Sequence, residues 1–193
     1  PHFAVSCQHY SFAVNAFVDV IRRFDAYQYD FTIREEQTHE IIEDVTNLKS
    51  ELGVIYLSSK NTEVLSKMLK RNELEFTELF TATPHVFICD SHPLAKKKSI
   101  TMEDLQDYPY LTYEQGEYNS QYFSEEFVST LDSRKNIRVR DRATLFNLII
   151  GLNGYTVCSG VISAELNGRN IISKPLDVEE YMQIGIITRK GVV

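Results

Sequence analysis

The sequence has no long hydrophobic run. Nowhere in its 193 residues do about 18 consecutive apolar residues occur, the length that a membrane-spanning helix requires. Residues 1–6 contain neither a basic stretch nor a long apolar one, so they do not predict a signal peptide. We therefore expect a cytoplasmic protein without a membrane partner. Because the sequence starts at Pro1 and not at methionine, we also expect it to be a piece of a longer protein.

Cysteine is scarce, and the three cysteines are scattered. Cys7, Cys89 and Cys158 form no CxxC pair and no cluster with histidine at metal-ligand spacing, so we expect neither a metal nor another cofactor. Free thiols fit the reducing cytosol. We expect Cys7 to lie in a pocket without a disulfide partner. The other two cysteines fall in apolar strands, so the sequence does not predict a redox-sensing disulfide.

Positive charge is also in short supply. The sequence has 27 acidic and 20 basic residues, which gives a formal net charge of −7. A surface that binds nucleic acid neutralises phosphates with lysine and arginine and is therefore basic. We do not expect this chain by itself to bind DNA or RNA.

The signatures of catalysis are missing. No nucleophile elbow, zinc-protease motif, phosphate-binding loop or dinucleotide fingerprint occurs. Cys7 and His9 lie two residues apart before a predicted helix, whose N-terminus can lower a thiol pKa, so a nucleophilic pair is one interpretation. We favour a packed cysteine beside a pocket histidine, because no third orienting group can be named. We predict no catalytic residues and no enzyme. Two acidic pairs are interpreted as solvated faces: Glu35-Glu36 and Glu125-Glu126.

What the sequence does contain is an alternation of short apolar strands and helices. Its 43% hydrophobic and 24% charged residues are typical of a globular protein. Strands are predicted at 3–7, 29–34, 52–57, 75–81, 85–89, 110–113, 137–140, 155–158 and 181–188. Helices are predicted at 11–24, 38–48, 61–70, 119–131 and 144–152, with a short one after Thr101. Such strand–helix–strand units indicate an α/β protein with parallel sheets covered by helices.

The predicted helix 11–24 is apolar around most of its circumference, with Ser11 as the candidate N-cap. A helix that lies on one sheet needs only one apolar face. Two explanations stay open at this point. The helix is buried within its own domain, or its second face packs on another subunit.

Polar residues follow several predicted strands, directly before predicted helices. In open parallel sheets, ligands bind outside the carboxyl ends of strands, where backbone N–H groups and helix dipoles converge. Each polar residue alone could be a simple helix cap, but together they predict a small polar cleft. Its predicted ligand-binding residues are Ser6, Gln8 and His9 on one side and Thr112, Gln115 and Gly116 on the other, followed by Ser58 and Thr144.

Four motifs in order resemble the effector-binding domain of LysR-type transcriptional regulators, and the likeness covers nearly all of the chain. The spacing of the second motif is the most specific, and a chance match of all four is improbable. The motifs are ELGVI at 51–55, HPLA at 92–95 followed by ITMEDL at 100–105 and YP at 108–109, LIIGLNG at 148–154, and TRKG at 188–191. One departure is Asn153, which stands where the family usually has glycine and is tolerable because asparagine enters the left-handed region readily.

The resemblance implies two Rossmann-like subdomains joined by two crossover segments, a fold like that of type 2 periplasmic binding proteins. Subdomain I would comprise residues 1–79 and 162–193, and subdomain II residues 80–161. A small-molecule effector would bind in the cleft between them and modulate DNA binding and transcription. A winged helix-turn-helix domain, absent from this chain, would precede Pro1 and make all the DNA contacts.

The resemblance also implies a homodimer, and a tetramer for the full-length protein. We expect helices 11–24 and 119–131 to meet in an antiparallel interface through Val14, Val18, Phe123 and Phe127. Residues 110–116 look like the corresponding stretch of sulfur-assimilation regulators, which favours an amino-acid or sulfur metabolite as effector. The alternative function is a solute-binding protein of a transporter. The apolar helix 11–24 favours the regulator, because solute-binding proteins are usually monomers.

Overall fold

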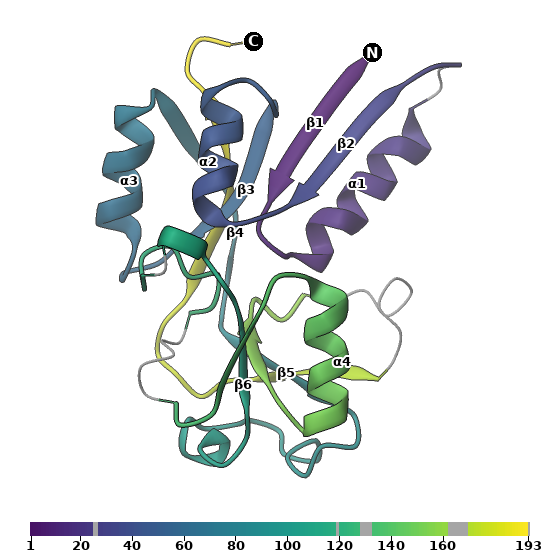
Figure 1. Cartoon of the computed structure of the whole chain (residues 1–193), viewed down its shortest axis with the longest axis vertical. Helices are drawn as coiled ribbons and strands as arrows, with labels where there is room; N and C mark the ends of the chain where they lie inside the picture. Colours follow the sequence, from purple (N-terminus) through teal and green to yellow (C-terminus); the bar gives the residue numbers. More distant parts are fainter. Residues whose placement is uncertain (25–26, 119, 128–132, 162–169, 193) are drawn as a thin grey trace.

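A computed structural model describes residues 1–24, 27–118, 120–127, 133–161 and 170–192. The chain forms two α/β lobes stacked along the long axis of the molecule (Figure 1). Both chain ends lie at the far end of the first lobe, so the chain crosses between the lobes and returns. This arrangement agrees with the predicted fold class.

Lobe I is built on a five-stranded sheet with the order β2-β1-β3-β10-β4. The first three of these strands are parallel, whereas β10 runs antiparallel to both of its neighbours. The returning chain enters this sheet from lobe II, which reverses the direction of its last strand. The strands are β1 His2–Cys7, β2 Asp30–Glu35, β3 Leu52–Leu57, β4 Leu74–Ala82 and β10 Met182–Arg189, and the helices are α1 Ser11–Arg23, α2 Thr38–Thr46 and α3 Thr62–Arg71.

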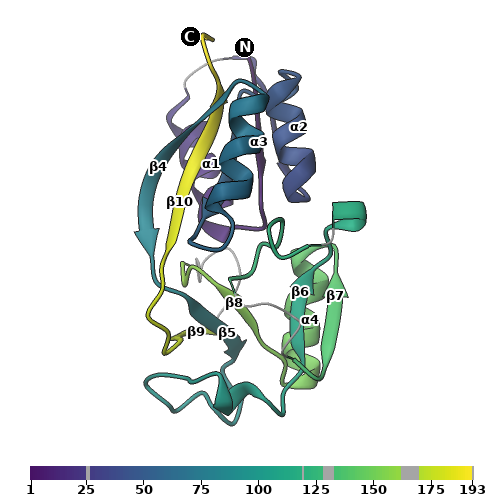
Figure 2. The same cartoon turned by 90° about the vertical axis from the view of Figure 1, so that its left-hand side faces the viewer.

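Lobe II is smaller and combines an antiparallel β8-β5-β9 sheet with a parallel β6-β7 pair. Helix α4 packs beside these strands (Figure 2). Its C-cap Asn153 adopts the left-handed conformation, with φ 51° and ψ 39°, as the departure from glycine predicts. The elements are β5 His85–Cys89, β6 Tyr110–Tyr113, β7 Asn136–Val139, α4 Arg142–Leu152, β8 Thr156–Cys158 and β9 Ile171–Pro175, with short 3-10 helices at Glu103–Leu105 and Gly116–Tyr118.

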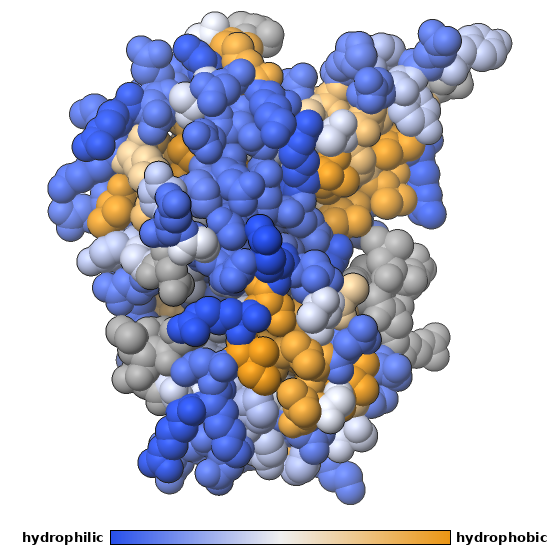
Figure 3. Space-filling view, in the orientation of Figure 1, coloured by the Kyte–Doolittle hydropathy of each residue, from blue (hydrophilic) through white to orange (hydrophobic). Residues whose placement is uncertain are grey.

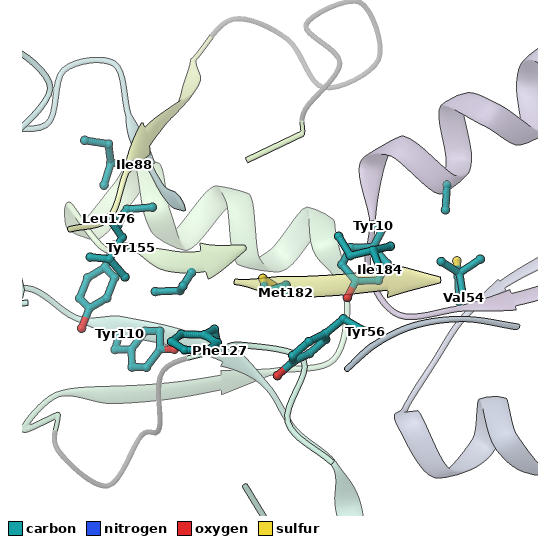
Figure 4. Close-up of a cluster of buried hydrophobic side chains, with 14 of the residues drawn as sticks. Tyr10, Val54, Tyr56, Ile88, Tyr110, Phe127, Tyr155, Leu176, Met182 and Ile184 are labelled. Atoms are coloured by element: carbon teal, nitrogen blue, oxygen red, sulfur yellow. The ribbon is translucent and has the colours of Figure 1, made fainter. Parts of the chain in front are cut away.

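One hydrophobic core runs through both lobes (Figure 4). Met182 lies between the two groups of side chains, at the start of the strand that returns to lobe I. The rings of Tyr110 and Tyr155 stack in its lobe II part, with centroids 4.8 Å apart. Other buried members are Val54, Tyr56 and Ile184 of lobe I and Ile88, Phe127 and Leu176 on the lobe II side.

Three sequence-based expectations about the elements are wrong. Residues 120–127 form turns and bends and not the first part of a helix 119–131, whose residues 119 and 128–131 lie outside the described residues. Ser11 is the first residue of α1 and not its N-cap, which is Tyr10. Strand β9 has no counterpart among the expected strands, because its sequence IISKP carries little alternation and ends in proline.

The two predicted subdomains have bounds that differ from the strand pairing. Strand β4 continues in the lobe I sheet to Ala82, beyond the predicted bound at residue 79. Strand β9 pairs with β5 in lobe II, whereas the predicted subdomain I includes residues 162–193. Strand pairing therefore favours crossings at 83–84 and 177–181.

Candidate functional site

The lobes meet where strands of both sheets end, and an irregular stretch of lobe II fills most of the contact. We call residues 114–118 and 120–127 the clamp segment. It follows β6, and its short helix Gly116–Tyr118 lies beneath the N-terminal end of α2 (Figure 1). The ring of Tyr118 stacks on His39 of α2 at 4.3 Å. Gly116 has φ +57°, and a Cβ atom there would lie 2.9 Å from Gln37 Oε1, so glycine permits this close approach.

His9 reaches from the end of β1 into lobe II. Its Nδ1 lies 2.8 Å from Glu125 Oε1, its Nε2 lies 3.0 Å from the Arg140 carbonyl oxygen, and its ring stacks on Tyr113 at 3.8 Å. Both ring nitrogens therefore face acceptors, which suits the doubly protonated imidazolium. Burial opposes that charge, but the Glu125 carboxylate outweighs it and raises the pKa of His9. The two side chains are only 4% and 5% exposed, so this is a buried ion pair between lobes.

Glu125 connects His9 to the start of α2. The backbone N–H of His9 also donates to Glu125 Oε1, at 2.7 Å, and Gln115 Nε2 donates to Glu125 Oε2 at 2.9 Å. Gln115 Oε1 in turn accepts from the N–H of Thr38 at 3.0 Å. The first N–H groups of a helix have no partner within the helix. The clamp segment thus supplies acceptors to donors that lobe I leaves free.

A second layer of hydrogen bonds fixes the residues behind this contact. Thr38 Oγ1 donates to the Phe123 carbonyl at 2.8 Å and accepts from Gln8 Nε2 at the same distance. Gln8 Oε1 accepts from the Tyr10 hydroxyl at 2.9 Å and from the N–H of Tyr56 at 3.3 Å. Gln8 is 1% exposed, and its polar atoms are bonded within the protein. It therefore acts as a structural connector in this closed arrangement.

Arg142, the first residue of α4, makes a separate bridge to lobe I. Its Nη2 lies 2.7 Å from Glu35 Oε1 at the end of β2, and its Nη1 donates to Ser11 Oγ at 2.9 Å. Burial raises the pKa of Glu35, and Arg142 partly opposes this effect. The two paired side chains are about one fifth exposed, so this bridge lies nearer to solvent than the His9 pair.

Glu126 lies beside Glu125 but is held differently. It accepts from the N–H of Tyr113 at 2.7 Å and from Ser124 Oγ at 3.1 Å. Burial, and then the negative charge of Glu125, raise the pKa of Glu126 to about 8. Two adjacent buried carboxyl groups therefore differ in their partners: Glu126 accepts from groups of lobe II and holds a proton more readily than an ordinary carboxyl group, whereas Glu125 contacts His9 of lobe I.

Little empty space remains deep between the lobes. A cavity of about 30 Å³ lies among His9, Tyr113, Arg142, Phe146 and Thr156. This is room for about two water molecules. Toward solvent, a hollow of about 530 Å³ opens beside Glu35, Glu36, Glu40, Glu114 and Arg140. The mouth of the cleft is open and its deep part is closed.

The structure brings together four of the predicted ligand-binding residues, namely Gln8, His9, Gln115 and Gly116. Ser6 points under α2, where its hydroxyl bonds Asp44 at 2.8 Å and Ser50 at 2.7 Å. Ser58 lines a different hollow, of about 370 Å³, beside Glu180. Thr144 is exposed and belongs to the N-terminal turn of α4, where Asp141 Oδ2 accepts from its N–H at 2.9 Å. Thr112 is buried on β6, opposite Arg138. Their roles in ligand binding stay predictions.

Sequence reasoning missed Thr38, Tyr56 and Glu125 as residues of this site. Thr38 meets the same criterion as the predicted ligand-binding residues, because it follows a predicted strand and begins a predicted helix. The interpretation of Glu125-Glu126 as a solvated face is wrong, since the two residues are 6% and 4% exposed. Local sequence could not reveal this, because the burial of the clamp segment depends on contacts with the other lobe.

The predicted interface residues fall into two groups. Val14 and Val18 are half-buried on α1, whereas Phe123 and Phe127 are 8% and 6% exposed and pack in the chain's own cores. Their role in a dimer stays a prediction.

The three cysteines are free, and Cys7 is fully buried. Burial raises the pKa of the Cys7 thiol, and nearby carboxylates such as Glu35 add to the effect. The Cys7 thiol is therefore a poor nucleophile. Across the described part of the chain, no group of potential ligands could hold a metal ion. No helix within the same residues is long and apolar enough to cross a membrane.

Comparisons with known proteins agree on the fold. The oxidised form of OxyR superposes with a TM-score of 0.65 at 14% sequence identity, covering 100% of this chain and 88% of that one. The reduced OxyR regulatory domain from Pseudomonas aeruginosa gives 0.65 at 18% identity, covering 99% and 90%. The effector binding domain of QuiR, in complex with shikimate, gives 0.64 at 19% identity, covering 100% and 89%. No curated protein sequence matches the chain.

A family model described as the LysR substrate binding domain matches residues 8–192. The match includes the strand ends, the clamp segment and both bridges between the lobes. The chain therefore belongs to the LysR substrate binding domain family, the ligand-sensing regulatory domains of LysR-type transcriptional regulators.

Proposed function

We propose that this domain binds a small polar metabolite between the lobes and thereby modulates DNA binding by a winged helix-turn-helix domain that precedes it in the full-length protein. One observation carries the proposal. The N–H groups of His9 and Thr38, at the starts of α1 and α2, both point at acceptors from lobe II. Donors in this arrangement suit a carboxylate or a sulfur oxyanion. Together with the likeness of 110–116 to sulfur-assimilation regulators, they favour an amino-acid or sulfur metabolite.

The proposed contacts are ordered by position. His9, Gln115 and Gly116 border the deep contact, and Thr38 joins them. Gln8 acts through Thr38, to which it donates. Ser6, Ser58, Thr112 and Thr144 come later, because they lie under α2, in another hollow, within β6 or at the surface.

A regulator explains the chain better than the alternatives do. Membership of the LysR family favours it over a solute-binding protein of a transporter. We also propose that the domain works in the cytoplasm and catalyses no reaction. Regulators of this family act on DNA as oligomers.

We infer a homodimer whose contact differs from the one that the sequence suggested. Two apolar surfaces stand out on one side of the molecule, over α1 and over α4 (Figure 3). Val20 and Phe24 of α1 are 46% and 37% exposed, and Ile150 and Leu152 of α4 are 42% and 48% exposed. An antiparallel pair would place α1 of one protomer on α4 of the other, twice, with Val14 and Val18 at its edge. We propose a tetramer for the full-length protein.

The dimer is tested by solution mass. A stable contact should bury at least about 1,000 Å². Val20→Asp and Ile150→Asp should each turn a micromolar dimer into a monomer, whereas Leu79→Asp, at a residue of β4 that is 53% exposed, should not. A monomeric parent, or dimers that survive both first variants, would contradict the interface.

Effector binding is tested by a thermal-shift screen of small metabolites. A ligand at 100 times its Kd stabilises the folded protein by about 2.7 kcal/mol. Thr112→Ala and Gln115→Ala should weaken binding of the compound found by about tenfold to a hundredfold. Lys98→Ala, in an exposed loop of lobe II, is the control and should bind like the parent. Unchanged binding in both site variants would show that the ligand sits elsewhere.

A further inference from the structure

The Glu125 carboxylate is bound as a ligand would be. It accepts three hydrogen bonds, from the His9 N–H at 2.7 Å, from His9 Nδ1 at 2.8 Å and from Gln115 Nε2 at 2.9 Å. Charge-assisted bonds of this kind are about twice as strong as neutral ones. A carboxylate with an imidazolium and two further donors around it has the surroundings of a bound anion.

The His9 donors and the Glu125 acceptor belong to different lobes. His9 lies between β1 and α1 of lobe I, and Glu125 lies on the clamp segment of lobe II. The neighbouring bond from the Thr38 N–H to Gln115 Oε1 joins the same two parts. Each bond therefore exists only while the lobes are closed on each other.

The deep contact has no room for a second anion beside Glu125. The adjoining cavity measures about 30 Å³, and the side chains of His9 and Glu125 are 4% and 5% exposed. A ligand that reaches the His9 donors must take the place of the Glu125 carboxylate.

We propose that Glu125 is a built-in occupant of the cleft, which holds the lobes closed without effector, and that the effector is a monocarboxylate that displaces it from His9. The inference rests on the proposed function in one respect, namely that the effector enters this cleft. It goes beyond that function by assigning the ligand-free state and the charge of the ligand.

The charges around His9 select one negative charge. If the Glu125 carboxylate leaves, the imidazolium loses its partner; an incoming anion restores this pairing, whereas a neutral ligand would leave His9 unpaired or deprotonated. The Glu35 carboxylate lies near His9, and Arg142 is a cation on this side. A second negative charge, as on phosphate, would meet Glu35 and the other carboxylates that line the outer hollow. The carboxylate of an effector carries one negative charge, which replaces the charge lost when Glu125 leaves.

The test is chemical rescue of a truncated side chain. Glu125→Ala removes a fragment equivalent to acetate, so acetate is the probe. The readout is hydrogen exchange of the backbone amides of His9 and Thr38, which donate two of the inter-lobe bonds. We expect exchange of these amides to be about tenfold to a hundredfold faster in Glu125→Ala, as for the loss of one charge-assisted bond. Sodium acetate should restore slow exchange, and sodium chloride at equal ionic strength should not.

The controls separate closure from folding. Glu117→Ala, on the same clamp segment at an exposed residue, should exchange like the parent. Acetate should leave exchange in the parent unchanged, because Glu125 already fills the position. If Glu125→Ala does not fold, Glu125→Gln keeps the shape of the side chain and should still show faster exchange at His9.

Three outcomes would overturn the proposal. They are unchanged exchange in a folded Glu125→Ala or Glu125→Gln, rescue by chloride as complete as by acetate, or acetate acting on the parent as it does on Glu125→Ala. None of these measurements contains an effector. If the metabolite screen finds no ligand, this result would count against the proposed function. The exchange measurements on closure of the lobes would still hold.

Discussion

The two lobes contribute to the cleft in different ways. Lobe I supplies donors that are fixed by regular structure, with His9 between β1 and α1 and the Thr38 N–H in the first turn of α2. Lobe II supplies acceptors from the irregular clamp segment, with Glu125 and Gln115 as the main ones. A rigid set of donors thus faces acceptors that can be withdrawn. This difference suits a sensor, because segments with less regular structure are the ones that open at low free-energy cost.

The largest loss of stability should come from removing His9, the lobe I partner of the ion pair. His9→Ala leaves the buried Glu125 carboxylate without its cation, so we expect a loss of about 3–5 kcal/mol in the free energy of unfolding. Urea denaturation measures it. Glu117→Ala, which is exposed on the clamp segment, should change stability by less than about 0.5 kcal/mol. Equal stabilities of the two variants would mean that the ion pair does not hold the lobes together.

A change of pH should have the next largest effect on the stability of the folded protein. The pKa values of Glu126 and Glu36 are raised to about 8 by burial, and that of His9 is raised by Glu125 against the effect of its own burial. Because each group binds its proton more tightly when folded, its stabilisation is complete below its unfolded pKa and is lost as pH rises through the folded pKa. The free energy of unfolding should therefore fall as pH rises from about pH 5 to about pH 9.

Urea denaturation at pH 5, 7 and 9 checks this dependence. Glu126→Gln carries no titrating proton and should flatten the curve. The lowered pKa of Asp44 works in the opposite direction, but only at acidic pH, below its ordinary value of 3.8. A parent protein that gains stability from pH 5 to pH 9 would contradict the raised pKa of Glu126.

A smaller effect is expected from Gln8, which lies behind the contact. Gln8→Ala leaves Thr38 Oγ1 and the Tyr10 hydroxyl without their partner, and we expect a loss of about 1–3 kcal/mol. A thermal melt without ligand detects it as a drop of several degrees. An unchanged melting temperature would show that these hydrogen bonds add little stability, and would favour direct ligand binding as the role of Gln8.

The smallest effect should come from the N-cap of helix α4 in lobe II. Asp141 caps α4 by accepting from the N–H of Thr144 at 2.9 Å and from its hydroxyl at 2.7 Å. Asp141→Ala should cost about 1 kcal/mol in unfolding free energy, as the loss of an N-cap usually does. Amide exchange of the His9 N–H should stay at the level of the parent, and faster exchange there would show that α4 helps to hold the cleft closed.

The same contrast between the lobes decides what the sequence could predict. Strands β3, β5 and β6 match their predicted bounds, because continuous apolar runs bounded by polar residues define them. The cluster of Gln8 and His9 with Gln115 and Gly116 followed from the rule that ligands bind at strand ends. The aromatic residues of the clamp segment have helical spacing and predict a helix, but residues 120–127 form turns and bends.

The burial of Glu125 and Glu126 depends on contacts with a distant part of the chain. Acidic pairs are solvated in most proteins, and only the docking of lobe I explains this exception. The antiparallel insertion of β10 likewise depends on the return of the chain from lobe II. Neither feature leaves a signal in local sequence.

The most direct test of the account is the distance between the lobes in solution without ligand. Nitroxide labels at Ser66→Cys in α3 and Lys98→Cys in lobe II both sit at exposed positions, and the unsubstituted protein controls for labelling of the native thiols. The account predicts one narrow distance distribution for this labelled protein and a broader or longer one when Glu125→Gln is added. The same distribution with and without Glu125→Gln would contradict the claim that Glu125 holds the lobes closed.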